Sequence, residues 1–401
     1  MRKSLGLFAL RILPAAFLTT AVAANAARAD LASDLRDCAR HRDANAGIAA
    51  CTRLLASGDL NLNAEAVAHS NRGTRYHRLR HHRKALADYD RAIALKPEFL
   101  AVYVKRGDVY MALGQPKMAV ADYTKAIDKR PKPRDKKAKA LVTPVVIDLY
   151  IRRSLAYQKL GRRGPAINDV NRALALDPKR ARTYIERGVM TARWGWRKQA
   201  MRDFDRAIKI DPKAYFAYVN RGLIYMERGQ AKRAIKDFDQ AIALQPAHAH
   251  AYFNRGTARA KLKQYKWAVM DVSHAIALAP GNASYFFQRA SIYRSIDKLA
   301  LALHDYDRAI ALNPQDAAYY NDRGTALGGL LRHRRAIADF SRAIELNAKL
   351  ADAYVNRGLA REVLEEHKGA QEDFRTALKL KPGDKRALAG LQRLRRLRRK
   401  R

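Results

Sequence analysis

Three histidines near the start of a repetitive region have the spacing best suited to metal chemistry. His77 and His81 are one helical turn apart, and His82 follows directly. Such a pair could bind a metal ion. Surface histidines in a basic turn explain the same pattern without a ligand, so the sequence favours no metal site here.

Motifs of catalysis or cofactor binding are absent from the sequence. It holds no phosphate-binding loop, nucleophile elbow, paired-histidine zinc helix or CxxC pair. Trp194 and Trp196 flank Gly195 and could anchor a ligand, although packing within a turn explains them equally well. We therefore expect neither catalytic residues nor cofactors, and a hidden hydrolase has no motif to support it.

The elements that must position these residues follow a strict repeat. The dipeptide Arg-Gly recurs in steps of 34 residues, and Ser154 and Ala290 fill the glycine position where glycine is missing. Aspartates from Asp88 to Asp373 and prolines from Pro97 to Pro382 keep the same step. One interval is longer by 13 residues, an insertion at 132–144. The spacing predicts nine units from about Ala66 onward.

Each unit reads as two short amphipathic helices joined by a tight turn. In the unit from Tyr215, one apolar stripe runs from Ala234 to Ile242, Gly229 marks the turn and Pro246 marks the end. A lone hairpin of this size cannot bury its stripe. We therefore expect neighbouring hairpins to stack over one continuous core.

The pattern resembles the tetratricopeptide repeat (TPR) family. In the unit from Tyr215, the matching positions are Tyr218, Gly222, Tyr225, Ala234, Phe238, Ala241 and Pro246. Comparable sets recur over residues 66–382, with departures such as His69, Val170, Val272 and Ala348. The resemblance implies an all-α, right-handed superhelical solenoid of about nine helical hairpins, spanning 66–384.

An arginine precedes the small residue in all nine units, from Arg72 to Arg357, and is matched by the aspartate series. We interpret Arg187 with Asp203, Arg221 with Asp237, and their equivalents as ion pairs between the two helices of a unit, because a partly buried arginine needs a partner. The alternative is that these arginines line a binding groove. Their presence in every unit favours the structural role.

The segments that flank the array are expected to cap it. Residues 30–65 resemble a degenerate repeat that places Cys38 and Cys51 at positions facing each other, which favours a disulfide over two buried free thiols. Residues 385–401 carry nine basic residues and no acid, with leucines spaced for one helical face, and predict a cationic capping helix. The basic insertion at 132–144 is either part of a binding face or a solvated loop or extended helix.

The N-terminus and the net charge indicate where the protein works. Arg2, Lys3, an apolar run from Ile12 to Ala24 and small residues at positions 27 and 29 predict an export signal over 1–29, although an uncleaved anchor is an alternative. We expect a periplasmic or secreted protein. The chain carries 79 Lys and Arg against 38 Asp and Glu, a net charge of +41 that cleavage would reduce to +37. Such a charge favours acidic or anionic partners.

The resemblance also implies a binding groove on the first helix of each unit, at places two, five, six, nine, twelve and thirteen. An apolar floor is expected from Val104, Ile151, Ile185, Val219, Leu223, Phe253 and Phe287, with a rim of Arg78, Lys159, Arg193 and Lys261. Asn220 and Asn254, with Asn71 and Asn356, form only a broken asparagine ladder. No unit has the Lys and Asn pair by which family members clamp a chaperone tail.

Two functions compete at this point. The first is a non-enzymatic scaffold that binds an extended or helical segment of an acidic protein partner in the groove. The second is binding of an anionic envelope polymer or membrane surface through the basic insertion and tail. The export signal disfavours nucleic acid. The sequence does not name the partner or the oligomeric state.

Overall fold

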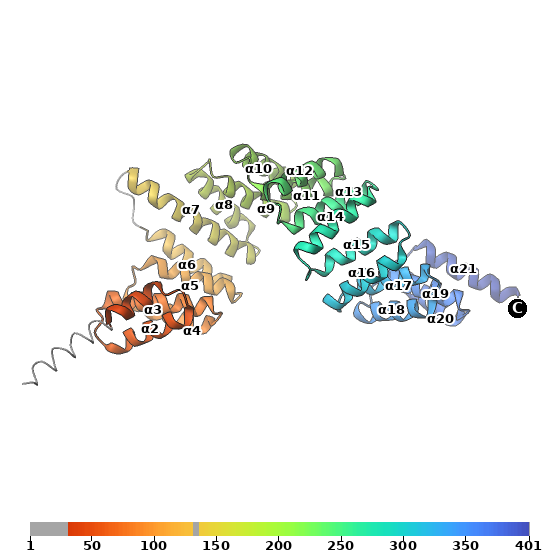
Figure 1. Cartoon of the computed structure of the whole chain (residues 1–401), viewed down its shortest axis with the longest axis horizontal. Helices are drawn as coiled ribbons and strands as arrows, with labels where there is room; N and C mark the ends of the chain where they lie inside the picture. The colour runs from red at the N-terminus through yellow and green to blue at the C-terminus, as the bar shows by residue number, and fades with distance from the viewer. Residues whose placement is uncertain (1–30, 131–135, 401) are drawn as a thin grey trace, which may run out of the picture. The chain divides into compact units, whose positions relative to one another are not determined.

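The computed structural model describes residues 31–130 and 136–400, and this part of the chain is all-helical. The predicted leader, 1–29, lies outside the described residues. The chain divides into a first unit, Met1–Glu186, and a second unit, Arg187–Arg401. Figure 1 shows antiparallel helix pairs stacked within each unit. The expected α-solenoid class is confirmed.

Helix 31–40 and α2 (Ala44–Ser57) form the first hairpin, whose turn is closed by the Asp43 carboxylate accepting a hydrogen bond from Ala46 N. The first array helix begins at Leu62, four residues before Ala66, because Asn61 caps it there. The helices of the first unit are α3 (Leu62–Arg78), α4 (His82–Leu95), α5 (Leu100–Ala112), α6 (Pro116–Asp128), α7 (Lys136–Lys159) and α8 (Arg163–Leu176).

The second unit continues the same alternation. Helix α9 (Ala181–Arg193) begins in the first unit and ends in the second. It is followed by α10 (Arg197–Ile210), α11 (Tyr215–Glu227), α12 (Ala231–Leu244), α13 (Ala249–Lys261), α14 (Tyr265–Leu278), α15 (Ala283–Ser295), α16 (Leu299–Leu312), α17 (Ala317–Gly329), α18 (His333–Leu346), α19 (Ala351–Val363), α20 (His367–Leu380) and the C-terminal α21 (Lys385–Lys400). Odd-numbered helices from α3 to α19 are A helices, and even-numbered helices from α4 to α20 are B helices.

The insertion lengthens an A helix. Helix α7 has 24 residues, whereas α5, α9 and α11 have 13 each. Of the predicted insertion at 132–144, the backbone from Lys136 onward is therefore helical, and Pro144 lies inside the helix. Residues 131–135 lie outside the described residues.

Most A helices cross their B helix at a glycine, whereas α7 and α15 have Ser154 and Ala290 at the same place. A Cβ added to Gly222 would come within 2.6 Å of Phe238 Cε1, closer than carbon atoms approach in proteins. Phe238 is fully buried, and its neighbour Ala234 has no exposed surface. At most crossings the glycine position admits an aromatic ring, and at Gly256 it admits Val272, which is why glycine or another small residue recurs there.

The inner face of each unit is made of A helices. In the second unit, α11 contacts α13, α13 contacts α15, α15 contacts α17 and α17 contacts α19, and in the first unit α3 contacts α5. Contacts of comparable extent between successive B helices do not occur among the described residues. The A helices therefore lie closer together than the B helices and line the side where a groove is expected.

Candidate functional site

Arg221 joins three helices of two hairpins. Its Nε and Nη2 donate hydrogen bonds of 2.9 and 2.7 Å to the carboxylate of Asp237 on α12, the B helix of its own hairpin. Its Nη1 donates a 2.7 Å hydrogen bond to Asp205 on α10, the preceding B helix. The hydrogen bonds that Arg221 donates to Asp237 are the main reason that the pKa of Arg221 is raised, which keeps the guanidinium charged.

The same bidentate bridge recurs throughout the array, and it includes the predicted pair of Arg187 with Asp203. The third partner varies: it is an aspartate for Arg106, Arg255 and Arg323, and a serine or threonine hydroxyl for Arg72, Arg153, Arg289 and Arg357. These arginines are therefore engaged in linking helices. The sequence predicted the bridge within a hairpin but missed the link to the preceding one.

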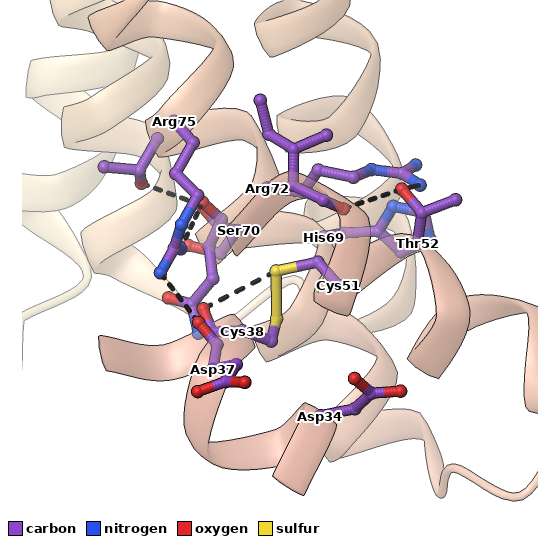
Figure 2. The surroundings of a disulfide bond; sticks show 12 residues. Asp34, Asp37, Cys38, Cys51, Thr52, His69, Ser70, Arg72 and Arg75 are labelled. Carbon is purple, nitrogen blue, oxygen red and sulfur yellow. Dashed lines mark hydrogen bonds between the residues drawn. A yellow bond between two sulfur atoms is a disulfide. The ribbon is translucent and has the colours of Figure 1, made fainter. Parts of the chain in front are cut away.

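The two cysteines are joined. Cys38 and Cys51 form a disulfide between helix 31–40 and α2, which confirms the predicted pairing (Figure 2). The bond lies in a small core of Ala50, Leu54 and Ala68. The disulfide therefore links the two helices of the terminal hairpin beside the surface of α3 on which they pack.

Arg75 fastens this hairpin to the array from the other side. Its Nη2 donates a 3.2 Å hydrogen bond to the carbonyl of Asp37 at the end of helix 31–40, and its Nη1 donates to the carbonyl of Asn71 (Figure 2). The side chain lies over Gly47, where a Cβ would come within 2.0 Å of Arg75 Nε. Burial, and then the charge of Arg78, lower the pKa of Arg75. Nothing in the repeat pattern singles out Arg75, which occupies the place after the glycine position and its threonine neighbour.

The groove of the first unit contains cations without carboxylate partners. Lys105 Nζ donates a 3.0 Å hydrogen bond to the hydroxyl of Ser70, and burial together with the charge of Arg75 lowers the pKa of Lys105. Among the described residues, Arg78, Lys105 and Lys159 form no salt bridge. Arg152, by contrast, is neutralised by Asp108 and Asp148.

The predicted apolar floor is only partly available to a ligand. Val219 is 7% exposed and packs against Ala241 and Ala251, so it belongs to the core, and its assignment to the groove is corrected. Leu223 is 38% exposed and is accessible. The remaining floor residues are half-buried, namely Val104, Ile151, Ile185, Phe253 and Phe287.

Aromatic stacking explains why the floor of the second unit is half-buried. Phe253 stacks on Tyr285 with ring centroids 4.9 Å apart, and Phe287 packs on Tyr319 at 4.8 Å. The ring of Phe216, which the sequence analysis passed over, is 50% exposed beside Tyr215. The signal for Phe216 was its position at place two of its unit.

The polar groove positions are also partly committed to the fold. Asn220 donates to the carbonyl of Phe216, one turn earlier in its own helix. Asn254 is half-buried, and the rim residues Arg193 and Lys261 are exposed. The Asn356 amide donates to Asn321 and its carbonyl accepts from Arg386, so this end of the ladder is occupied by α21.

The other residues singled out in the sequence have structural partners. The His77 ring lies against His82 rather than His81, with 3.2 Å between their Nδ1 atoms, and burial followed by the His82 charge lowers the pKa of His77. Trp194 and Trp196 pack edge to face. No cluster of three or more His, Cys, Asp or Glu with metal-binding geometry occurs in the described part of the chain.

Charge in the groove differs between the two units. In the first unit, the groove places hold five cations against three carboxylates: Arg78, Lys105, Arg152, Lys159 and Arg182, with Asp108, Asp148 and Glu186. In the second unit, they hold three cations against four carboxylates: Arg193, Lys261 and Arg294, with Glu227, Asp322, Asp352 and Glu362. The high positive charge of the protein therefore lies mainly outside the groove.

Stacked helical hairpins with an inner face of A helices define an α-solenoid, a class of repeat protein. Family models match the chain in five stretches: one described as TPR repeat at 222–263, one as tetratricopeptide repeat at 71–134 and 321–385, and another so described at 147–180 and 283–316. The chain belongs to the tetratricopeptide repeat family. In general terms it is therefore a scaffold for protein–protein interaction.

Solved structures share this fold at low identity. One chain in the structure of the APC/C hetero-tetramer Cut9–Hcn1 is 15% identical to this chain, with a TM-score of 0.52. The match covers 93% of this chain and 88% of that chain. A tetratricopeptide repeat protein from Parabacteroides merdae is 20% identical to this chain, with a TM-score of 0.50. The match covers 62% of this chain and 99% of that protein. These similarities show the fold alone. No curated protein matches the chain.

Proposed function

We propose that the chain is an exported, non-enzymatic scaffold that binds an extended or helical acidic segment of a partner protein on its A-helix face. The observation that carries the proposal is that Arg78, Lys105 and Lys159 in the groove of the first unit form no salt bridge within the described part of the chain. Lys105 is half-buried beside Ser70 and has no carboxylate partner among the described residues. A partly buried cation without a counter-charge gains most from an incoming carboxylate.

Half-buried apolar side chains support the same reading. Val104 is the neighbour of Lys105 on α5. Ile151 lies on α7, about two helical turns before Lys159. A segment with acidic side chains flanking apolar ones would place carboxylates at the cations and bury its apolar side chains on this floor. The balanced charge of the second unit's groove gives no comparable preference for acid.

Peptide binding tests the proposal directly. The full chain is titrated against immobilised peptides in which Glu and Leu alternate, with Lys and Leu peptides for comparison. Lys105→Glu with Lys159→Glu should weaken capture of the acidic peptides by at least about tenfold, since two favourable pairs become repulsive. Lys213→Glu with Lys349→Glu, two exposed lysines outside the groove, is the matched control. Unchanged capture by the groove variant would show that the groove assignment is wrong.

A second function, binding of an anionic polymer or membrane surface through the tail, has its own observation. Arg395, Arg396 and Arg398 on α21 are exposed and have no carboxylate partner among the described residues. Arg393 differs, because it pairs with Glu362. Reversal of the three exposed charges, rather than deletion from Arg393, tests this function, since Leu394 is 7% exposed and belongs to the core.

A further inference from the structure

Outside the basic C-terminal segment 385–401, most of the net positive charge of the second unit lies on one edge. All A-to-B turns face this edge, and we define the turn edge as residues 194–199, 228–233, 262–267, 296–301, 330–335 and 364–369. It holds twelve cations and three carboxylates, Asp297, Glu365 and Glu366. The cations are all exposed: Arg197, Lys198, Arg228, Lys232, Arg233, Lys263, Lys266, Lys298, Arg332, Arg334, Arg335 and Lys368.

Two other faces of the same unit are close to neutral. The opposite edge, formed by the B-to-A turns at 211–214, 245–248, 279–282, 313–316, 347–350 and 381–384, holds three cations and three carboxylates. The cations are Lys213, Lys349 and Lys381. The groove of this unit holds three cations and four carboxylates. The turn edge is therefore more basic than the opposite edge and the groove, and its charge does not follow simply from a uniformly basic composition.

Folding alone does not explain these cations. Every B helix of the second unit begins at the turn edge, and none of them has an acidic residue in its first turn. A helix N-terminus carries positive partial charge, so lysine and arginine there are unfavourable. Among the described residues, only Arg197 of the twelve has a carboxylate partner, Glu227. The edge therefore carries unneutralised charge at a cost in stability.

Large apolar side chains are exposed between the cations. Trp196, Trp267, Leu301 and Leu331 on this edge are 45%, 52%, 47% and 78% exposed. Leu331 and Leu364 also line a hollow of about 540 Å³, together with Arg332, His333, Arg334 and Arg335. Cationic and apolar groups thus share one surface, where a soluble protein usually places polar residues.

We propose that the turn edge docks the second unit onto the surface of a lipid bilayer that carries anionic headgroups. Lysine and arginine near such a surface are each attracted by its negative potential, and tryptophan and leucine insert at the level of the headgroups. A soluble polyanion would engage the cations but would leave the exposed apolar side chains in water. This inference goes beyond the groove function, because it uses a different face and leaves the A helices free for a partner.

Vesicle binding tests the inference on the full chain. Sedimentation with vesicles of phosphatidylglycerol and phosphatidylcholine is compared with vesicles of phosphatidylcholine alone, and binding should require the anionic lipid. The variant Arg332→Glu/Arg334→Glu/Arg335→Glu should weaken binding on the order of 100-fold. Trp267→Ala with Leu301→Ala, which leaves every charge in place, should weaken it by roughly tenfold.

Two comparisons decide the outcome. Lys213→Glu with Lys349→Glu reverses charges on the opposite edge and should bind vesicles like the parent chain. Dextran sulfate, a soluble polyanion, should be bound equally well by the Trp267→Ala/Leu301→Ala variant and the parent. The inference is overturned if that variant binds vesicles normally, or if reversal of Arg395, Arg396 and Arg398 abolishes vesicle binding while reversal of the edge does not. Thermal stability of each variant no lower than that of the parent chain excludes misfolding as the cause.

Discussion

Arg221 and Asp237 are joined by two parallel hydrogen bonds, of 2.9 and 2.7 Å, across the crossing of α11 and α12. The Arg221 side chain is 19% exposed and the Asp237 side chain is 7% exposed. A pair this shielded from water is stabilising only as long as both partners are present, because either charge alone would be left in a poorly solvated place.

Removal of one carboxylate should therefore expose the difference between a buried and an exposed partner. Asp237→Ala should destabilise the α11–α12 hairpin by about 3 kcal/mol, since Arg221 loses its main partner. Asp205→Ala removes the third partner, which is 56% exposed, and should cost less than about 1 kcal/mol. Hydrogen exchange of amides in α11 and α12 measures the local effect. Equal effects of the two variants would contradict the assignment of Asp237 as the principal partner.

Substitution of alanine for two glycines of α17 should have opposite effects on stability. A Cβ on Gly324 would come within 2.7 Å of Phe340 Cε1, whereas a Cβ on Gly328 meets no atom within 4 Å. Gly324→Ala should destabilise by about 1–3 kcal/mol through overpacking. Gly328→Ala should stabilise by about 0.5–1 kcal/mol, because alanine favours the helix. Thermal melts of both variants decide, and a loss of stability in Gly328→Ala would show that the helix is crowded on both faces.

Reduction of the disulfide should loosen the first hairpin without melting the array. A loop of 13 residues closed by a disulfide contributes about 3 kcal/mol by restricting the unfolded chain. Arg75 still holds helix 31–40 to α3, and packing against Ala68 still holds α2 to α3, so the array from α3 onward should remain folded. Hydrogen exchange should become faster in residues 31–57 of Cys38→Ser/Cys51→Ser and stay unchanged beyond α4. Faster exchange throughout the first unit would contradict this.

The fold could be predicted from the sequence because each repeat has the same residue types at the positions where its two helices cross and end. Gly222, Phe238 and Pro246 recur at fixed places, and one crossing geometry satisfies all of them. The Cys38–Cys51 pairing followed from the same register, since the two residues occupy places that face each other. Regular repetition thus makes one unit informative about the rest.

The candidate site could be predicted only in outline, because exposure depends on neighbouring hairpins. Val219 and Phe253 occupy the same place in successive units, yet Val219 is buried between helices while Phe253 is half-buried against Tyr285. The third partner of each repeat arginine comes from the preceding hairpin, which no single repeat encodes. The separation of charge between groove and turn edge likewise depends on how the helices of successive hairpins are stacked.

Asp322 is a carboxylate whose charge should work against the fold. Burial raises its pKa above the usual value, an effect that the nearby Arg294 only partly offsets and that Asp352 reinforces. A carboxyl whose pKa is higher in the folded state stabilises the protein while protonated and loses that contribution as pH rises through the folded pKa. Asp322→Asn should therefore raise the melting temperature at pH 7.

The pH dependence of the difference checks the cause. The advantage of Asp322→Asn over the parent chain should shrink between pH 7 and pH 4, because the parent carboxyl becomes protonated and the two side chains then differ little in charge. Asp316→Asn is the matched control in the same helix. Asp316 accepts a hydrogen bond from Ala318 N at the start of α17, where a negative charge is favourable, so its substitution should leave stability equal or slightly lower at pH 7. A lower melting temperature for Asp322→Asn at pH 7 would mean that its 3.5 Å contact with Arg294 outweighs the burial of its charge.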